Sequence, residues 1–128
     1  MSENFNVLIF SVDQIFVSIL NRIFENIDKK FQVEVFQFFS EAQNFTENKP
    51  ADLILVDDHI IGTSSYELIS FLRLHKIFIC PVFYFGTSEY EGERKALLIG
   101  ANKFFNKPFK PDEIAQAVGN TLNKNKKK

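Results

Sequence analysis

The sequence predicts an α/β domain in which helices cover both faces of a parallel sheet. Five short apolar runs alternate along the chain with five segments of helical character, a pattern typical of parallel strands joined by right-handed crossovers. The run Leu53–Val56 is apolar without alternation, as expected for a strand buried on both faces, and it stops at Asp57-Asp58. Parallel sheets place their chemistry just beyond the carboxyl ends of the strands, so Asp57 is the first candidate functional residue.

Length and composition are those of one globular domain. The chain has 128 residues, 45% of them hydrophobic and 24% charged, and a net charge of -1 argues against binding to nucleic acid or membranes through bulk charge. The single cysteine excludes an intramolecular disulfide. The N-terminus lacks the basic residues of a secretory signal, and no segment has the ~20 apolar residues of a membrane helix. We therefore expect a cytoplasmic single domain over residues 1–123.

In the first half, periodicity and capping residues define the elements. Apolar residues recur every three or four positions after Asp13, which stands at a natural N-cap. A later segment begins with strict alternation, which favours a half-buried strand, and Pro50 closes a weak helical segment behind it. The expected elements are a strand at Asn6–Phe10, a helix at Gln14–Asn26, a strand at Phe31–Phe39 and a short helix from Ser40.

In the second half, proline and glycine mark the boundaries. Gly100 is a good residue just past a helix, and Pro111 suits the first turn of the last helix. The expected elements are the strand Leu53–Val56, a helix at Ser65–Leu74, a strand at Val82–Phe85, a helix at Glu89–Ile99, a strand at Phe104-Phe105 and a helix from Pro111 to Leu122. The Lys-rich tail, residues 124–128, has no apolar residue and is expected to be disordered.

Two motifs, PADLILVDDHIIG and ALLIGANKFFNKPFKPDEI, resemble the receiver domain of two-component response regulators, and the similarity covers residues 6–122. The resemblance implies a flavodoxin-like, doubly wound fold with strand order 2-1-3-4-5. It places Asp57 at the position of the aspartate that accepts phosphate. It also implies that Lys107 points inward toward Asp57, that a cis peptide bond precedes Pro108, and that Phe104 matches an aromatic residue that changes rotamer on activation.

This sequence departs from the family pattern at positions important for the chemistry. Where the family has two adjacent acidic residues that hold a divalent cation, the alignment places Ser11 and Val12, with Asp13 one residue late. After the fourth strand the family has Thr or Ser. Counting from the strand start puts Gly86 there and Thr87 next, but the following loop is one residue short, so either residue fits the hydroxyl position.

These departures predict that Mg²⁺ binding is weakened. Mg²⁺ is anchored by one or two carboxylates and keeps several waters. The ligands left by the resemblance are Asp57, Asp13 and the backbone carbonyl of His59, and Asp13 serves equally as a helix cap. The run Asp57-Asp58-His59 invites interpretation as a metal site, but three consecutive side chains rarely converge on one ion. Without a cation, Lys107 would be the main charge balancing Asp57.

The resemblance implies a stand-alone signalling domain that is not an enzyme. In one hypothesis a histidine kinase or phosphotransfer protein phosphorylates Asp57, Thr87 supplies the hydroxyl that follows the phosphoryl group, and the change reaches a downstream protein through the last two helices and the last strand. In the other, which the site residues favour, a degenerate receiver signals without Asp57 phosphorylation or Mg²⁺. Dimerisation through the last helix stays open. A nucleotide-binding enzyme is disfavoured because SVDQIF, after the first strand, contains no glycine.

Overall fold

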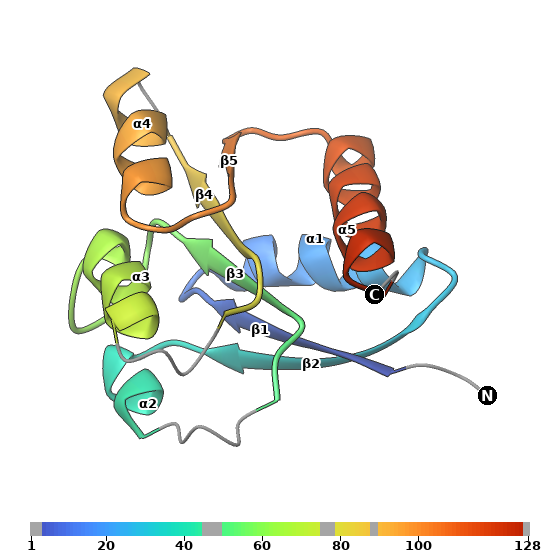
Figure 1. Cartoon of the computed structure of the whole chain (residues 1–128), viewed down its shortest axis with the longest axis horizontal. Helices are drawn as coiled ribbons and strands as arrows, with labels where there is room; N and C mark the ends of the chain where they lie inside the picture. Colours follow the sequence, from blue (N-terminus) through green and yellow to red (C-terminus); the bar gives the residue numbers. More distant parts are fainter. Residues whose placement is uncertain (1–3, 45–49, 75–78, 88–89, 127–128) are drawn as a thin grey trace.

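The computed structural model describes residues 4–44, 50–74, 79–87 and 90–126, and it confirms the doubly wound α/β fold. One five-stranded sheet has the order β2-β1-β3-β4-β5, and every strand pair is parallel (Figure 1). The strands are β1 Asn4–Phe10, β2 Lys30–Phe36, β3 Leu53–Asp57, β4 Val82–Gly86 and β5 Lys103–Asn106. The helices are α1 Gln14–Glu25, α2 Phe39–Gln43, α3 Ser65–Leu74, α4 Tyr90–Leu98 and α5 Pro111–Lys126.

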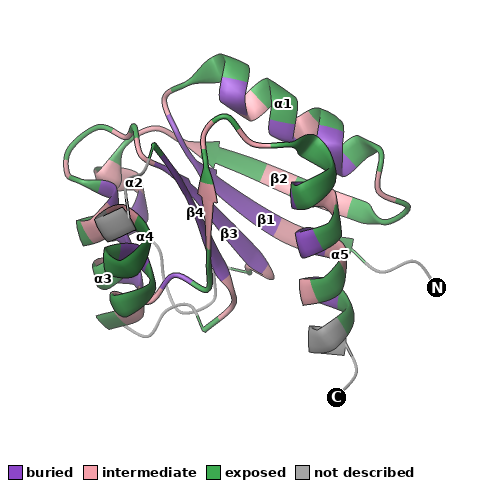
Figure 2. Cartoon of the chain, turned by 90° about the horizontal axis from the view of Figure 1, so that it is seen from above, coloured by how far each residue is buried: buried purple, intermediate pink, exposed green. Residues whose placement is uncertain are grey.

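Helices α1 and α5 cover one face of the sheet, and α2, α3 and α4 cover the other (Figure 2). Successive side chains of a strand point to opposite faces, so Leu53 and Leu55 of β3 pack toward α1 and α5. Ile54 and Val56 pack toward the other three helices. All four are buried, which explains why this strand has a continuous apolar run rather than an alternating pattern.

The strand predicted at Phe31–Phe39 is shorter in the structure, because β2 ends at Phe36 and α2 begins at Phe39. The carboxylate of Glu41 accepts hydrogen bonds of 3.1 Å from the backbone N–H groups of Gln37 and Phe38. This acceptor satisfies backbone donors ahead of the helix, so the chain turns there instead of continuing as a strand. The pattern of apolar residues alone predicted the longer strand.

The last helix extends further than the sequence predicts. It reaches Lys126, so the predicted boundary between the domain and a disordered tail falls inside α5; residues 127–128 lie outside the described part. Propagating an existing helix adds a hydrogen bond for each residue fixed, and lysine is a good helix former, so one more turn needs no apolar contact. Among the described residues, none of the helices is long and apolar enough to cross a membrane.

The carboxyl ends of β1, β2 and β3 lie at one edge of the sheet, where backbone hydrogen bonds join the segments that follow them. The N–H of Ser11 donates to the carbonyl of Phe36 at 2.9 Å. The N–H of Val12 donates to the carbonyl of His59 at 3.1 Å. The loops after β1, β2 and β3 are therefore held together around the end of the central strand.

Candidate functional site at the end of the central strand

Asp57 is the last residue of β3, and its side chain is completely buried. Oδ1 accepts hydrogen bonds from Nζ of Lys107 and from the backbone N–H of Asp58, the latter at 2.9 Å. Oδ2 accepts a hydrogen bond of 2.7 Å from the hydroxyl of Ser11. The hydroxyl of Ser65, the first residue of α3, donates to the backbone carbonyl of Asp57. The buried carboxylate therefore accepts hydrogen bonds from residues that directly follow β1, β3 and β5. The first residue of α3 binds the backbone of Asp57.

Lys107 follows directly after β5, and its side chain extends along the carboxyl-terminal edge of the sheet (the mouth of the sheet) to Asp57. Its backbone N–H donates to the carbonyl of Gly86 at 3.0 Å, and the peptide bond to Pro108 is cis, as the resemblance implies. Its Nζ contacts Asp57 Oδ1 and lies 4.8 Å from the centre of the Phe16 ring. Two residues predicted to meet, fifty positions apart in the sequence, do meet.

The structure gives Ser11 and Asp13 different roles: Ser11 binds Asp57, and Asp13 caps helix α1. The Ser11 hydroxyl, which donates to Asp57, also accepts the backbone N–H of Asp13 at 2.9 Å. Oδ1 of Asp13 accepts the backbone N–H groups of Ile15 and Phe16 at 3.0 and 3.1 Å. Asp13 is thus the N-cap of α1, and its carboxylate is directed to the helix end rather than to Asp57.

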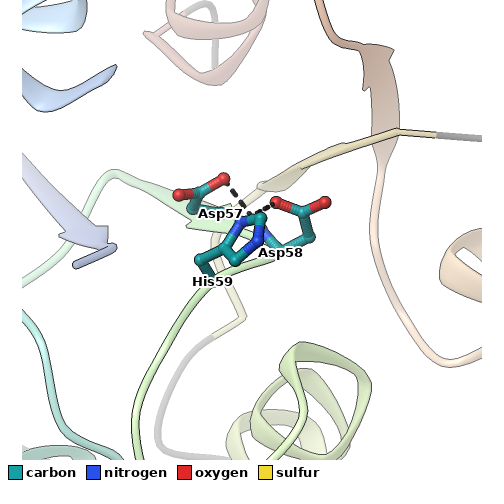
Figure 3. A group of neighbouring side chains, drawn as sticks. All are labelled: Asp57, Asp58 and His59. Carbon is teal, nitrogen blue, oxygen red and sulfur yellow. Dashed lines mark hydrogen bonds and ion pairs between the residues drawn. The ribbon is translucent and has the colours of Figure 1, made fainter. Parts of the chain in front are cut away.

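Asp58 and His59 continue the cluster beyond β3 (Figure 3). Oδ1 of Asp58 lies 2.9 Å from Nζ of Lys107 and 2.8 Å from Nδ1 of His59. Ligand atoms of Asp57, Asp58 and His59 all lie within 4.8 Å of one another, so three consecutive side chains do converge here, contrary to the expectation from their spacing. They do so because the chain turns sharply after the strand and because Lys107 attracts both carboxylates.

Burial and pairing shift the three charged groups in different directions. Burial raises the pKa of Asp57 above its usual value, although Lys107 and Ser11 oppose the shift. Burial acts in the same sense on Asp58, but hydrogen bonds with Lys107 and Asp57 outweigh it and lower the pKa of Asp58. Burial alone would lower the pKa of Lys107, yet its hydrogen bonds with both carboxylates raise that pKa. The lysine therefore stays protonated while shared between two acids.

The structure places Gly86, rather than Thr87, at the end of β4 beside the site. Gly86 pairs with Asn106 of β5, while Thr87 is exposed and contacts the cluster through its backbone N–H, 3.3 Å from Asp58 Oδ2. A Cβ on Gly86 would lie 3.0 Å from the Tyr84 ring and 3.3 Å from the Phe104 ring. Phe104 is partly buried, with its ring 5.5 Å from that of Tyr84. Two aromatic rings thus occupy the space of a side chain at position 86.

The family model of the response regulator receiver domain matches residues 7–119 of this chain. The chain belongs to the receiver domain family. Receiver domains are signalling domains of two-component systems; they interact with histidine kinases or phosphotransfer proteins and with downstream partners, and they typically bind Mg²⁺ at acidic residues. A comparison with curated proteins gives no match.

Solved structures of response regulators have the same fold. A two-component response regulator from Clostridium difficile has a TM-score of 0.82 at 19% identity, covering 95% of this chain and 98% of that one. The receiver domain of the Francisella response regulator 1452 has a TM-score of 0.79 at 24% identity, covering 94% and 98%. The chemotaxis response regulator CheY4 of Vibrio cholerae has a TM-score of 0.78 at 16% identity, covering 94% and 100%. At these identities the likeness shows the fold.

The donors around Asp57 bear on whether this receiver's residues fit Mg²⁺. A carboxylate offers about four lone-pair directions, and three hydrogen bonds to Asp57 leave about one. Asp13 caps a helix, the carbonyl of His59 already accepts the N–H of Val12, and Val12 itself offers no oxygen ligand in its side chain. Mg²⁺ requires nearly octahedral oxygen ligands. The ligand set that the resemblance implies is therefore incomplete as arranged, although Asp58 and His59 place further ligand atoms within 4.8 Å of Asp57.

Two residues of the receiver site were not predicted as functional, namely Ser65 and Asp58. The sequence indicated a functional role for Ser65 only weakly, because a serine at the start of a helix is ordinarily explained by helix capping. Asp58 was considered only as a metal ligand beside His59. Its contact with Lys107 depends on the position of β5, which sequence spacing does not encode.

Proposed function

We propose that this receiver takes its input as a phosphoryl group on Asp57, transferred from a histidine kinase or a phosphotransfer protein. An oxygen of the Asp57 carboxylate would form a bond to phosphorus while the phosphorus–nitrogen bond of the donor's phosphohistidine breaks, leaving the electron pair on the imidazole nitrogen. The observation that carries this proposal is the contact of buried Asp57 with Lys107 at the mouth of the sheet. Lys107 supplies positive charge where negative oxygens gather in such a transfer.

We further propose that Mg²⁺ binding is weakened in this receiver. Ser11 and Val12 stand where the resemblance implies acidic ligands, and Ser11 donates to Asp57 instead of presenting a negative charge. Bound Mg²⁺ would add charge balance, but the three hydrogen bonds to Asp57 leave it only about one lone-pair direction on that carboxylate. Thr87 stays a candidate for the hydroxyl near the phosphoryl group, although its backbone is the part that contacts the cluster.

The proposed output is contact with a downstream protein through α4, β5 and α5. Leu97 and Leu98 of α4 are exposed, with relative areas of 43% and 76%, and exposed leucines side by side favour a protein contact. A second copy of this chain is one candidate for that contact. Sedimentation of the protein before and after treatment with beryllofluoride tests it, since association that requires this face should be lost in a Leu98→Glu variant.

A second candidate function is a receiver that signals without phosphorylation of Asp57. The specific observation that favours it is that Ser11, Asp58 and Lys107 already donate three hydrogen bonds to the carboxylate, which offers about four lone-pair directions. Every donor present lowers the tendency of the oxygens to attack phosphorus, because each stabilises the ground state. Protein contacts would then depend on the amount of this chain and on its partners, and not on its modification.

Incubation with acetyl phosphate, with and without Mg²⁺, separates the two functions. Phosphorylation should add the mass of one phosphoryl group to the wild-type protein and nothing to Asp57→Asn. Asp52→Asn is a matched control, since Asp52 lies at the other end of β3 and accepts the backbone N–H of Asn6. Modification of wild type and Asp52→Asn alone supports phosphorylation. No modification under either condition, with a folded protein, supports the second function.

A further inference from the structure

Asp58 is the residue of the cluster to which the resemblance assigns no role. It lies in the loop directly after β3, and its side chain is 15% exposed. Oδ1 is paired with Lys107 and with His59, and Oδ2 accepts the N–H of Thr87. An ordinary loop aspartate is solvated and seldom collects partners from three segments. This one joins the loop after β3 to the ends of β4 and β5.

Lys107 has two carboxylate partners rather than one. Its Nζ contacts Oδ1 of Asp57 and lies 2.9 Å from Oδ1 of Asp58, and its side chain is 18% exposed. An ammonium has three donors and no acceptor, so two carboxylates in contact with it satisfy most of its hydrogen bonding. The Phe16 ring, 4.8 Å from Nζ, covers a further side of the charge. The ammonium is therefore fixed in place and not free to sample solvent.

We propose that Asp58 is the second acid of this site, a positioning residue that shares the Lys107 ammonium with Asp57 and holds it at the mouth of the sheet in place of a divalent cation. The inference rests on the proposed function for the role of Asp57 as the reacting group. The contacts that carry it belong to the unmodified protein. The cation of the site is thus the Lys107 ammonium, which is part of the chain and which a chelator cannot remove.

The arrangement also connects the cation to the loop before α4. Asp58 binds Lys107 through Oδ1 and the backbone of Thr87 through Oδ2. When Asp57 carries additional negative charge, Lys107 is attracted toward Asp57 and its contact with Asp58 weakens. Asp58 then loses the partner that holds its carboxylate in place. A change at Asp57 therefore reaches the start of the β4–α4 connection by way of one shared lysine.

The direct test observes the Lys107 ammonium by NMR in protein labelled with ¹⁵N-lysine. Its side-chain signal should be visible in wild type, because hydrogen-bonded ammonium protons exchange slowly, while the exposed Lys103 and Lys110 should give no signal. In Asp58→Asn the exchange should be at least about tenfold faster and the signal lost, as expected when a strong charge-assisted hydrogen bond is removed. In the control Asp52→Asn the signal should be unchanged. An unaltered Lys107 signal in Asp58→Asn overturns the proposal.

A double-mutant cycle measures the same pairing independently. Asp58→Asn and Lys107→Met are combined, and the unfolding equilibrium constant is measured for each protein. We expect the pair to be non-additive by about three- to tenfold, since residues in direct contact couple while distant ones add. Asp52→Asn combined with Lys107→Met should be additive. Additivity of Asp58→Asn with Lys107→Met overturns the proposal.

A third measurement needs no substitution and applies if a variant fails to fold. In the wild-type protein, a nitrogen held by two carboxylates is a poor nucleophile, so acetylation of Lys107 by an amine-specific reagent should be at least about tenfold slower than acetylation of Lys103 and Lys110. Equal rates overturn the proposal. Failure of Asp57 to react with acetyl phosphate would remove the proposed function and leave all three of these results as expected, so the two failures are distinguishable.

Discussion

The hydroxyl of Ser11 donates a hydrogen bond of 2.7 Å to Oδ2 of Asp57, and both side chains are buried. Ser11 directly follows β1 and Asp57 is the last residue of the neighbouring parallel strand β3; the register pairs Phe10 with Val56 and so brings the two following positions together. A hydroxyl satisfies a buried carboxylate without adding charge, whereas an acidic residue in its place would require a cation. Ser11 therefore satisfies Asp57 without requiring a cation at this position.

Ser11→Ala should destabilise the protein, because it removes a hydrogen bond to a buried charged acceptor. The expected loss in the free energy of unfolding is about 1–3 kcal/mol, measured by urea denaturation. Ser18→Ala is the matched control: Ser18 is exposed on α1, and the change there should stay within about 0.5 kcal/mol of wild type. Equal effects at the two serines would show that the Ser11 contact contributes nothing specific.

Asp57→Asn should be more stable than wild type at neutral pH. Since the pKa of Asp57 is raised in the folded protein, the folded state favours the neutral form, and the stability this provides is lost as the pH rises through the folded pKa. Asparagine imitates the neutral carboxyl at every pH. The gain should be on the order of 1 kcal/mol and should shrink as the pH falls toward the usual pKa of 3.8.

Asp58→Asn should have the opposite sign and is the internal control for this pH series. The pKa of Asp58 is lowered, so its ionised form stabilises the fold above the usual pKa, and that stability is lost as the pH falls through the folded pKa. Asp58→Asn should therefore be less stable than wild type at neutral pH and approach it in acid. If both variants change stability in the same direction, the assignment of the two carboxylates is wrong.

Gly86→Ala should destabilise the protein by about 1–3 kcal/mol, because the added Cβ would press on Tyr84 and Phe104. The matched control is Gly119→Ala in α5, where a Cβ meets nothing within 4 Å and the substitution should stabilise the helix by about 0.5–1 kcal/mol. Thermal melts of both variants give the comparison. Combining Gly86→Ala with Tyr84→Leu should restore part of the loss, and no restoration would contradict the packing argument.

Arg73→Ala should loosen the edge of the sheet opposite the site. The guanidinium donates to the carbonyls of Cys80 and Gly100, both at 2.9 Å, and Nη2 also bonds Oδ1 of Asn102 at 2.9 Å. Removal should lower the free energy of unfolding by about 2–4 kcal/mol, since several acceptors lose a charged donor at once. Arg94→Ala, on an exposed position of α4, should be nearly neutral. Hydrogen exchange should increase in the α4–β5 loop of Arg73→Ala alone.

The sequence predicted the features that depend on local pattern. Buried strands have continuous apolar runs, so β3 and its terminal Asp57 were identifiable, and the resemblance placed Lys107 opposite. The boundary at Phe36 was missed because it depends on a carboxylate, that of Glu41, accepting backbone hydrogen bonds.

Contacts between strand ends were not predictable from the sequence. The donation of Ser11 to Asp57 and the sharing of Lys107 with Asp58 follow from where three strands end relative to one another. The same holds for the choice between Gly86 and Thr87. Spacing allowed either residue at the end of the strand, and the structure ends β4 at Gly86, where a Cβ would meet the rings of Tyr84 and Phe104.

The most direct test of the central claim, that chain groups and not Mg²⁺ complete the Asp57 site, is a Mg²⁺ titration of the unmodified protein. Backbone amide shifts of Asp57, Asp58 and His59 are followed by NMR at constant ionic strength, with Ca²⁺ as a comparison ion. We expect no saturable change in the millimolar range. In a Ser11→Asp, Val12→Asp variant, which supplies acidic ligands, we expect a saturable response. Saturable binding of Mg²⁺ by the wild-type protein in that range would contradict the claim.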